Sequence, residues 1–138
     1  MDIHWQSPGR ESLELNVKVE NQNVSGVTMK CSGSLAFLRM SQDLKAQLTG
    51  PVDKIATPTG NTPGALIWRE VLQKIQGSWK LPVEHEELCH CRKVNTAKVD
   101  EAIVYGAHTP EQIRKRTSAN TGCGTCLADI ESLIKNRL

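Results

Sequence analysis

The chain has 138 residues, of which 38% are hydrophobic and 4% aromatic, so it can form one ordinary domain or two small ones. Its 17 basic and 15 acidic side chains leave a net charge of +2, too small for a dedicated nucleic-acid-binding protein. No apolar run approaches the roughly 20 residues that span a bilayer, and the first residues lack the apolar segment of a signal peptide. We therefore expect a cytoplasmic protein without a membrane partner.

The first elements that the sequence predicts are two antiparallel strands. Apolar residues at 13, 15, 17 and 19 alternate with polar ones, which is the pattern of a half-buried strand. Turn-forming residues at 21–23 precede a second strand, which carries Val24, Val27, Met29 and Cys31, so the two form a hairpin. We interpret Cys31 as a small buried strand residue, with an auxiliary thiol as the functional alternative.

Two helices are predicted after the hairpin. The first runs over residues 35–48 and ends near Gly50; its apolar positions with helical spacing are Leu35, Leu38, Leu44 and Leu48. The second begins with Thr62 as its N-cap and Pro63 in its first turn, and ends near Gly77. Its apolar stripe comprises Leu66, Ile67, Val71 and Ile75. The fold class of this half is therefore α+β.

The composition changes near residue 85, after a short linker that contains Pro82. Residues 1–88 carry a net charge of −1, whereas residues 89–138 carry +3 and four of the five cysteines. We therefore divide the chain into an α+β domain, 1–84, and a helical domain, 85–138. The second domain should contain a helix capped by Thr96, a helix that begins with the capping box of Thr109 and Gln112, and a last helix over residues 127–134.

Four cysteines form the strongest pattern in the sequence. They are arranged as Cys89-His90-Cys91, then 31 residues, then Cys123-Gly124-Thr125-Cys126. Two close pairs joined by a helical hairpin suit a single four-thiolate site, which takes either zinc or an iron–sulfur cluster. Either group would leave the site with a charge of about −2, because four thiolates outweigh the metal charge. Nearby donors that could stabilise this charge are Arg92, Lys93, Thr121 and Thr125.

This spacing resembles that of the BFD-like family, the bacterioferritin-associated ferredoxin type. The pattern C-x-C-x31-C-x2-C, the T-P-E-Q helix start and the loop N-T-G-C-G-T-C are all similar to it. The resemblance implies a small all-helical fold with a 2Fe–2S cluster held by Cys89, Cys91, Cys123 and Cys126. It also implies a role in electron transfer or iron–sulfur handling. Zinc stays as the alternative metal, although zinc sites favour C-x2-C or C-x4-C over C-x-C.

The first half resembles the IscU/NifU type of cluster scaffold. The similar segments are Ser7-Pro8-Gly9, Met29 to Ser34, and the helix from Gly64 to Gln73, and NifU also places such a domain before a BFD-like one. Two of the three ligand cysteines of that family are replaced here, by Pro8 and Gly64, and the third position falls at Cys31 or Ser32. The resemblance therefore implies a degenerate scaffold, kept for docking or dimerisation.

Together these patterns predict a 2Fe–2S cluster-binding protein of the NifU/BFD-like type that transfers single electrons to or from a protein redox partner. The alternatives are a cluster assembly or delivery protein with a cluster acceptor as its partner, and an adaptor with a structural four-cysteine metal site. No nucleophile with a base and no paired carboxylates appear, so we do not expect an enzyme. We interpret Arg114-Lys115-Arg116 as a solvated helix face, or else as a docking patch for an acidic partner. The oligomeric state does not follow from the sequence.

Overall fold

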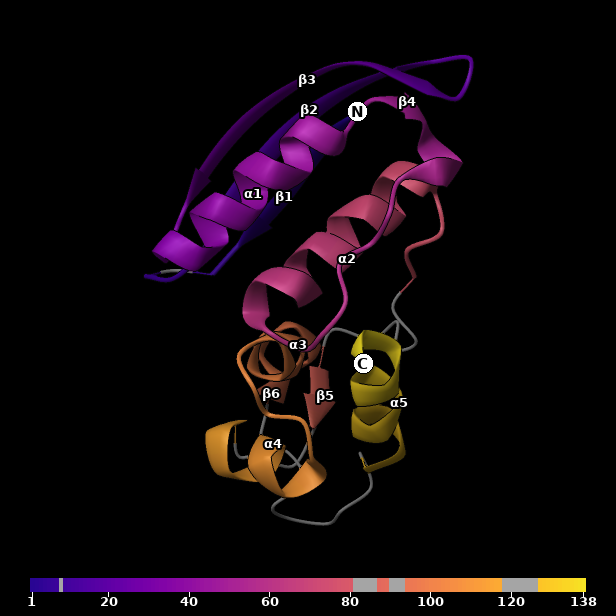
Figure 1. The fold of residues 1–138 in the computed structure, drawn as a ribbon. Helices are drawn as coiled ribbons and strands as arrows, with labels where there is room; N and C mark the ends of the chain where they lie inside the picture. The colour runs from indigo at the N-terminus through magenta and orange to yellow at the C-terminus, as the bar shows by residue number, and fades with distance from the viewer. Residues whose placement is uncertain (8, 81–86, 90–93, 118–126) are drawn as a thin grey trace. The chain divides into compact units, whose positions relative to one another are not determined.

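The computed structural model describes residues 1–7, 9–80, 87–89, 94–117 and 127–138, with backbone only at 87–89 (Figure 1). The chain divides into two compact units. The first unit contains Met1–Gly60 and Ile67–Trp79, and the second contains Asn61–Leu66 and Lys80–Leu138. Each unit is described by itself below.

The first unit is built on an antiparallel sheet with the strand order β1-β2-β3-β4. Its strands are β1 (Asp2–Gln6), β2 (Ser12–Glu20), β3 (Asn23–Ser32) and β4 (Gly50–Pro51). The predicted hairpin is confirmed as β2 and β3. Asn21 and Gln22 both have positive φ, at 51° and 62°, which is what a type I′ hairpin turn requires of its two central residues. The short strands β1 and β4 were not predicted.

The strand β2 buries one face, as its alternating pattern predicted, but only for part of its length. Leu13, Leu15 and Val17 are at most 2% exposed. Val19, the next residue of the pattern, is 37% exposed. The register with β3 shifts between Lys18 and Val19, and such a bulge re-aims the side chains that follow it. The prediction that Val19 belongs to the buried face was therefore wrong.

The helix α1 (Leu35–Gln47) has the predicted position but a different buried face. Its N-cap is Ser34, whose Oγ accepts a hydrogen bond from the Phe37 amide at 3.2 Å. The buried residues of this segment are Phe37, Ser41, Leu44 and Leu48, whereas Leu35 is 62% exposed. The hydroxyl of Ser41 accepts a hydrogen bond from the indole Nε1 of Trp68 at 2.9 Å, which offsets the cost of burying this polar group. The predicted core position of Leu35 is thus wrong.

The helix α2 (Pro63–Gln76) follows the short 3-10 helix η1 (Val52–Lys54) and agrees closely with the prediction. The Ala65 amide donates to the Thr62 hydroxyl at 3.3 Å, so Thr62 is the N-cap. Gly77, with φ of 78°, has the left-handed conformation that commonly ends a helix. The buried residues of α2 include the whole predicted stripe together with Ala65, Trp68 and Leu72.

The second unit contains three helices and a short hairpin. The hairpin consists of β5 (Glu87–Cys89) and β6 (Val94–Asn95), and the helices are α3 (Thr96–Val104), α4 (Pro110–Thr117) and α5 (Leu127–Arg137). The three helices were predicted; the strand pair was not. The N-cap of α3 is Asn95, whose side chain accepts from the Lys98 amide at 2.7 Å, so the predicted cap at Thr96 was one residue too late.

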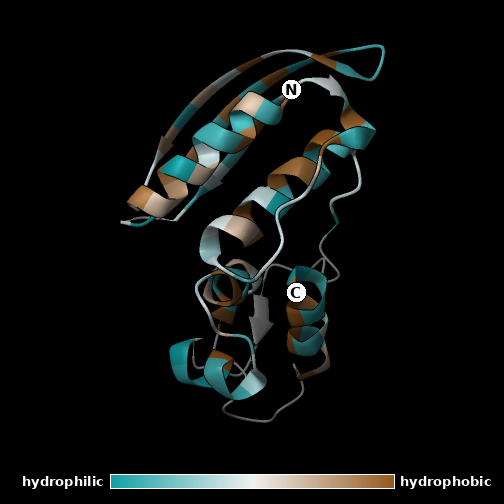
Figure 2. Ribbon diagram, in the orientation of Figure 1, coloured by the Kyte–Doolittle hydropathy of each residue, from teal (hydrophilic) through white to brown (hydrophobic). Residues whose placement is uncertain are grey.

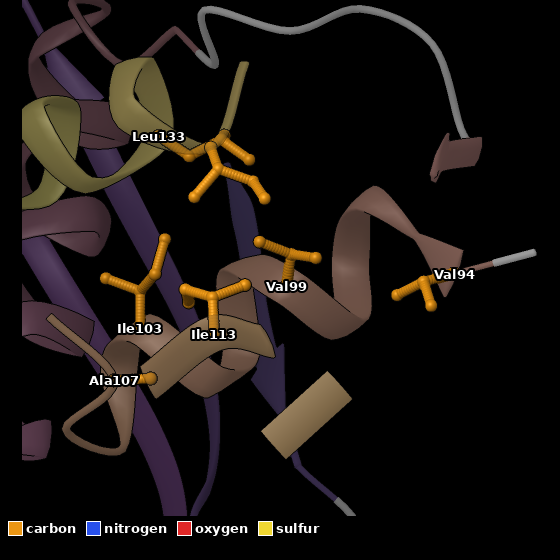
Figure 3. Close-up of a cluster of buried hydrophobic side chains, with 7 residues drawn as sticks. Val94, Val99, Ile103, Ala107, Ile113 and Leu133 are labelled. Atoms are coloured by element: carbon orange, nitrogen blue, oxygen red, sulfur yellow. The ribbon is translucent and has the colours of Figure 1, made fainter. Parts of the chain in front are cut away.

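Aliphatic side chains from β6, from the three helices and from the turn after α3 form the core of the second unit (Figure 3). The cluster comprises Val94, Val99, Ile103, Ala107, Ile113, Ile130 and Leu133, all at most 5% exposed. Burial of a Val, Leu or Ile side chain contributes about 1.5–3 kcal/mol, so this cluster is the main source of packing energy in the unit. Ala102 and Ile134 pack at its margin.

The described helices are short. The longest is α2, with 14 residues, against the roughly 20 apolar residues that a membrane-spanning helix needs. Among the residues that the structure describes, no helix has both the length and the apolar character to span a membrane.

Candidate metal centre

The two cysteine pairs lie at the ends of the segment that contains α3 and α4. The backbone of Cys89 lies in β5, opposite Val94 of β6. Its side chain, and all of Cys91, Cys123 and Cys126, lie outside the described residues. The convergence of these four cysteines on one centre therefore stays a prediction. The roles of the expected donors at 92, 93, 121 and 125 also stay predictions, because these residues lie outside the description.

The described frame connects the two pairs through packed helices. The hairpin that contains Cys89 leads directly into α3, and Cys126 immediately precedes the first residue of α5. The helices α3, α4 and α5 pack against one another in all three combinations. Each cysteine pair is thus attached to an element that belongs to the same helical core, as expected for residues that hold a group in a fixed geometry.

The turn between α3 and α4 is held by a dense set of hydrogen bonds. Gly106 has φ of 104°, and the Ala107 amide donates to the Ala102 carbonyl at 2.9 Å, which together form a Schellman-type helix end. The Ile103 carbonyl lies 3.0 Å from Nε2 of His108. His108 is therefore half-buried, with a defined contact.

The start of α4 confirms the predicted capping box, with one difference. The Gln112 amide donates to Oγ1 of Thr109 at 3.3 Å, as expected. In return, Oε1 of Gln112 accepts from the backbone amide of His108 at 2.8 Å, one residue before the cap. Arg116 extends from the far end of α4 to the Tyr105 carbonyl, with Nη1 at 2.6 Å from that oxygen. The connection between the two helices is therefore fixed from both sides.

A buried ion pair joins α3 to α5, and sequence reasoning missed it. Nε and Nη2 of Arg137 lie 2.9 and 2.6 Å from the two carboxylate oxygens of Asp100. The exposed fractions of the two side chains are 2% and 15%. Nη1 of Arg137 also lies 3.4 Å from the Leu66 carbonyl, within the same unit. The available signal was the spacing of Ile130, Leu133 and Arg137, which places the arginine on the apolar stripe of α5.

The basic run of α4 is largely exposed. Lys115 and Arg116 are exposed and Arg114 is half-buried. Most of this helix is coloured as hydrophilic in Figure 2, and Ile113 is the apolar side chain that it contributes to the core. Because Arg116 caps the Tyr105 carbonyl, the run both supports the turn and presents positive charge to solvent.

The first unit shows how the scaffold-like positions are filled. Cys31 is half-buried in β3, opposite Leu13, so it is less buried than predicted. Oγ of Ser32 lies 2.7 Å from Oγ of Ser12. Gly33 has φ of 146°, a conformation that L side chains rarely adopt, and a Cβ there would lie 2.7 Å from Cγ of Glu11. Pro8 lies outside the description, and Gly64 is a buried residue of α2.

Within the described part of the chain, no three His, Cys, Asp or Glu side chains are grouped so that they could hold a metal ion. Cys31 is the only cysteine among residues 1–88, so the first half contributes at most one thiolate to any metal site. The remaining four cysteines all lie between 89 and 126. Any four-thiolate site in one chain must therefore draw at least three of its ligands from that segment.

Comparison with known proteins identifies relatives of both halves. Residues 88–136 match the family model of the BFD-like 2Fe-2S binding domain. The chain is also 29% identical, over 102 residues, to the Nitrogen fixation protein NifU of Leptolyngbya boryana. That alignment covers 68% of this chain and 47% of the relative, so the chain spans about half the length of the curated protein it matches. No solved structure matches the chain.

These matches concern the four cysteines that we predict as ligands. All four cysteines of the predicted site lie within residues 88–136, and four thiolates are the number that a 2Fe–2S cluster takes. Residues 88–138 make up less than half of the chain, so an alignment covering 68% of it also reaches into the residues before 88. The predicted relation to NifU is therefore confirmed and extends beyond the C-terminal domain.

Proposed function

We propose that this chain, whose residues 88–136 form a BFD-like 2Fe–2S binding domain, is a ferredoxin-type carrier of single electrons. The proposed ligands are Cys89, Cys91, Cys123 and Cys126. When bound, a 2Fe–2S cluster supplies reversible one-electron chemistry. The match of residues 88–136 to this domain, together with the four cysteines inside it, is the observation that carries the proposal. In the proposed role the chain passes electrons between proteins and catalyses no reaction of its own.

The described residues support this role by making the frame rigid. The aliphatic core of α3, α4 and α5, the capped turn at Gly106 and the ion pair of Asp100 with Arg137 each restrict how the helices can shift. A close-packed interior resists changes in the positions of the groups attached to it. Ligands that keep one geometry when a charge arrives or leaves suit electron transfer, which requires little rearrangement at the site.

The charge of the C-terminal segment favours an acidic protein as redox partner. The side chains of residues 89–138 sum to +3, which the charge of about −2 at the loaded site reduces to about +1, and Lys115 and Arg116 are two positive charges on the exposed side of α4. Complementary charge mainly accelerates and orients the encounter of two proteins, and it is weakened by salt. Reduction by such a partner should therefore slow as ionic strength rises.

Metal and sulfide analysis tests the proposal. Full-length protein purified without oxygen should contain iron and acid-labile sulfide in about equal amounts, and should accept one electron per cluster. Cys126→Ser should lose the iron and the visible absorption. Cys31→Ser, the matched control outside the proposed site, should keep both. Zinc without sulfide in the purified protein would contradict the proposal and favour the adaptor with a structural metal site.

A role in cluster assembly or delivery is the second candidate, because the similarity to NifU extends into the first half. The first half has a single cysteine, whereas the labile site of the scaffold family that it resembles uses three. We therefore rank delivery below electron transfer. The distinguishing experiment mixes cluster-loaded protein with an apo-acceptor and follows transfer against the rate of reduction by a reductase. Fast transfer with slow reduction would reverse the ranking.

A further inference from the structure

The second unit is not continuous in the sequence. It contains Asn61–Leu66, at the start of α2, together with Lys80–Leu138. The family match begins only at residue 88, so residues 61–66 lie well before the matched domain. Within this early segment Ala65 and Leu66 are 1% exposed, and none of its side chains is charged. A short neutral segment is thus part of a unit whose other residues come later in the chain.

Arg137 connects this early segment to the helices of the second unit. Its Nη1 atom lies 3.4 Å from the Leu66 carbonyl oxygen, in a buried contact. Its Nε and Nη2 atoms donate to the carboxylate of Asp100 in α3. Because the guanidinium is planar and its donors have fixed directions, both contacts hold only when α3, α5 and residues 61–66 keep one arrangement.

The helix α5 joins this contact to a predicted metal ligand. It has 11 residues, which makes it about 16 Å long. Cys126 immediately precedes its first residue, and Arg137 is its last. Between these ends, Ile130 and Leu133 pack in the core of the unit. A close-packed helix has few alternative positions, so a constraint at one end also restricts the other.

We propose that occupancy of the metal centre controls the order of residues 61–66, through α5 and Arg137. Cys126 is fixed when the centre is loaded, and the start of α5 is fixed with it. When the centre is empty, α5 loosens, Arg137 releases the Leu66 carbonyl, and Ala65 and Leu66 become exposed. Loaded and empty protein then differ in a surface outside the matched domain. The inference rests on the four-cysteine site of the proposed function, but it holds for zinc as well as for a 2Fe–2S cluster.

Such a coupling is reciprocal, because two linked binding or ordering equilibria must change each other by the same factor. A substitution that loosens residues 61–66 should therefore weaken metal binding, and Thr62→Ala provides it. The Thr62 hydroxyl accepts from the Ala65 amide at 3.3 Å, and the Thr62 carbonyl accepts from the Leu66 amide at 3.0 Å. Loss of the capping hydroxyl frays the segment but changes no residue of α3, α4 or α5.

Ser34→Ala is the matched control for the loss of a cap. The Ser34 hydroxyl is the N-cap acceptor of α1 and accepts from the Phe37 amide at 3.2 Å. Each variant removes one capping hydroxyl, but Ser34 belongs to the first unit and Thr62 to the second. Only Thr62→Ala should therefore change the affinity for the metal.

Equilibrium competition with a chromophoric chelator measures the zinc affinity of the full-length chain, since four-thiolate sites take zinc. We expect the dissociation constant for zinc to rise roughly twofold to fivefold in Thr62→Ala, because the coupling transmits part of the energy of the cap. It should stay unchanged in Ser34→Ala. In an Arg137→Lys background the effect of Thr62→Ala should disappear, because lysine cannot contact Asp100 and the Leu66 carbonyl together.

Hydrogen exchange provides a second readout, on the protein as purified and after removal of its metal. The amides of Ala65 and Leu66 should exchange at least about tenfold faster in the empty protein, because the segment has lost a hydrogen bond to a charged group. The amides of Val71 and Leu72, which lie in the first unit, should keep their protection.

Each of three zinc results would overturn the proposal. They are equal affinities of Thr62→Ala and wild type, an equal loss in Ser34→Ala, and the same effect of Thr62→Ala in both backgrounds at Arg137. Unchanged exchange at Ala65 and Leu66 after metal removal would overturn it as well. Purified protein that holds zinc without sulfide would contradict the proposed electron transfer, whereas the coupling would still be decided by these measurements.

Discussion

Arg137, the last residue of α5, donates two parallel hydrogen bonds to the carboxylate of Asp100 in α3. The arginine side chain is 2% exposed, so its charge is compensated inside the protein rather than by water. The pair thus joins the helix that follows Cys126 to the helix that follows the first cysteine pair. Its removal offers a direct test of how the second unit is stabilised.

Replacing one member of this pair should destabilise the second unit strongly. Arg137→Met leaves the Asp100 carboxylate without its partner, and such losses cost about 2–4 kcal/mol at a site that is mostly but not fully buried. Arg137→Lys should recover only part of this energy, because lysine cannot form the two-point contact. Urea unfolding, followed through the visible absorption of the protein, measures the effect. An equal free energy of unfolding for wild type and Arg137→Met would show that the ion pair does not stabilise the fold.

The hydrogen bond from Trp68 to Ser41 should stabilise the first unit. Ser41→Ala leaves the indole N–H buried without its acceptor, which costs about 1–3 kcal/mol. Ser12→Ala removes an exposed hydroxyl pair with Ser32 and should change the free energy of unfolding by less than about 0.5 kcal/mol. Tryptophan fluorescence during urea unfolding compares the two. Equal free energies of unfolding for Ser41→Ala and Ser12→Ala would contradict this prediction.

Gly106 should be intolerant of substitution. Its φ of 104° lies in the region that non-glycine residues rarely adopt, so Gly106→Ala should cost about 1–2 kcal/mol. Gly26→Ala is the control, because a Cβ there would meet Lys18 only at an ordinary contact distance of 3.8 Å. Thermal unfolding of both variants provides the comparison. A larger loss at Gly26 than at Gly106 would argue against the described turn.

Removal of the metal should unfold the C-terminal half selectively. A short segment buries little apolar surface, so a bound cluster adds much of its stability. We expect Cys123→Ser to abolish hydrogen-exchange protection in α3, α4 and α5 while β2 and β3 stay protected. The fluorescence of the three tryptophans, which all lie within residues 1–79, should change little. Loss of protection in both halves would show that the predicted boundary at 84 does not separate independent units.

Elements that depend on neighbours in the sequence were predicted well. The hairpin of β2 and β3, the N-cap at Thr62 and the capping box before α4 follow from side-chain alternation and from hydrogen bonds that span three or four residues. Each of the two cysteine pairs is also a local pattern, because its members lie only two or three positions apart in the sequence. The matching domain covers all four of these residues.

What depends on contacts between distant residues was not predicted. The buried face of α1 includes Ser41, whose hydroxyl accepts a hydrogen bond from a tryptophan 27 residues away, a contact that the leucine spacing does not reveal. The pair of Asp100 with Arg137 joins residues 37 apart, and β1 forms a strand because β2 offers it a partner. Periodicity and capping act within a few residues, so the sequence alone determined the local elements, and it supplied the four cysteines of the predicted site. Only the tertiary structure decided which faces and charges meet, because burial depends on what packs opposite.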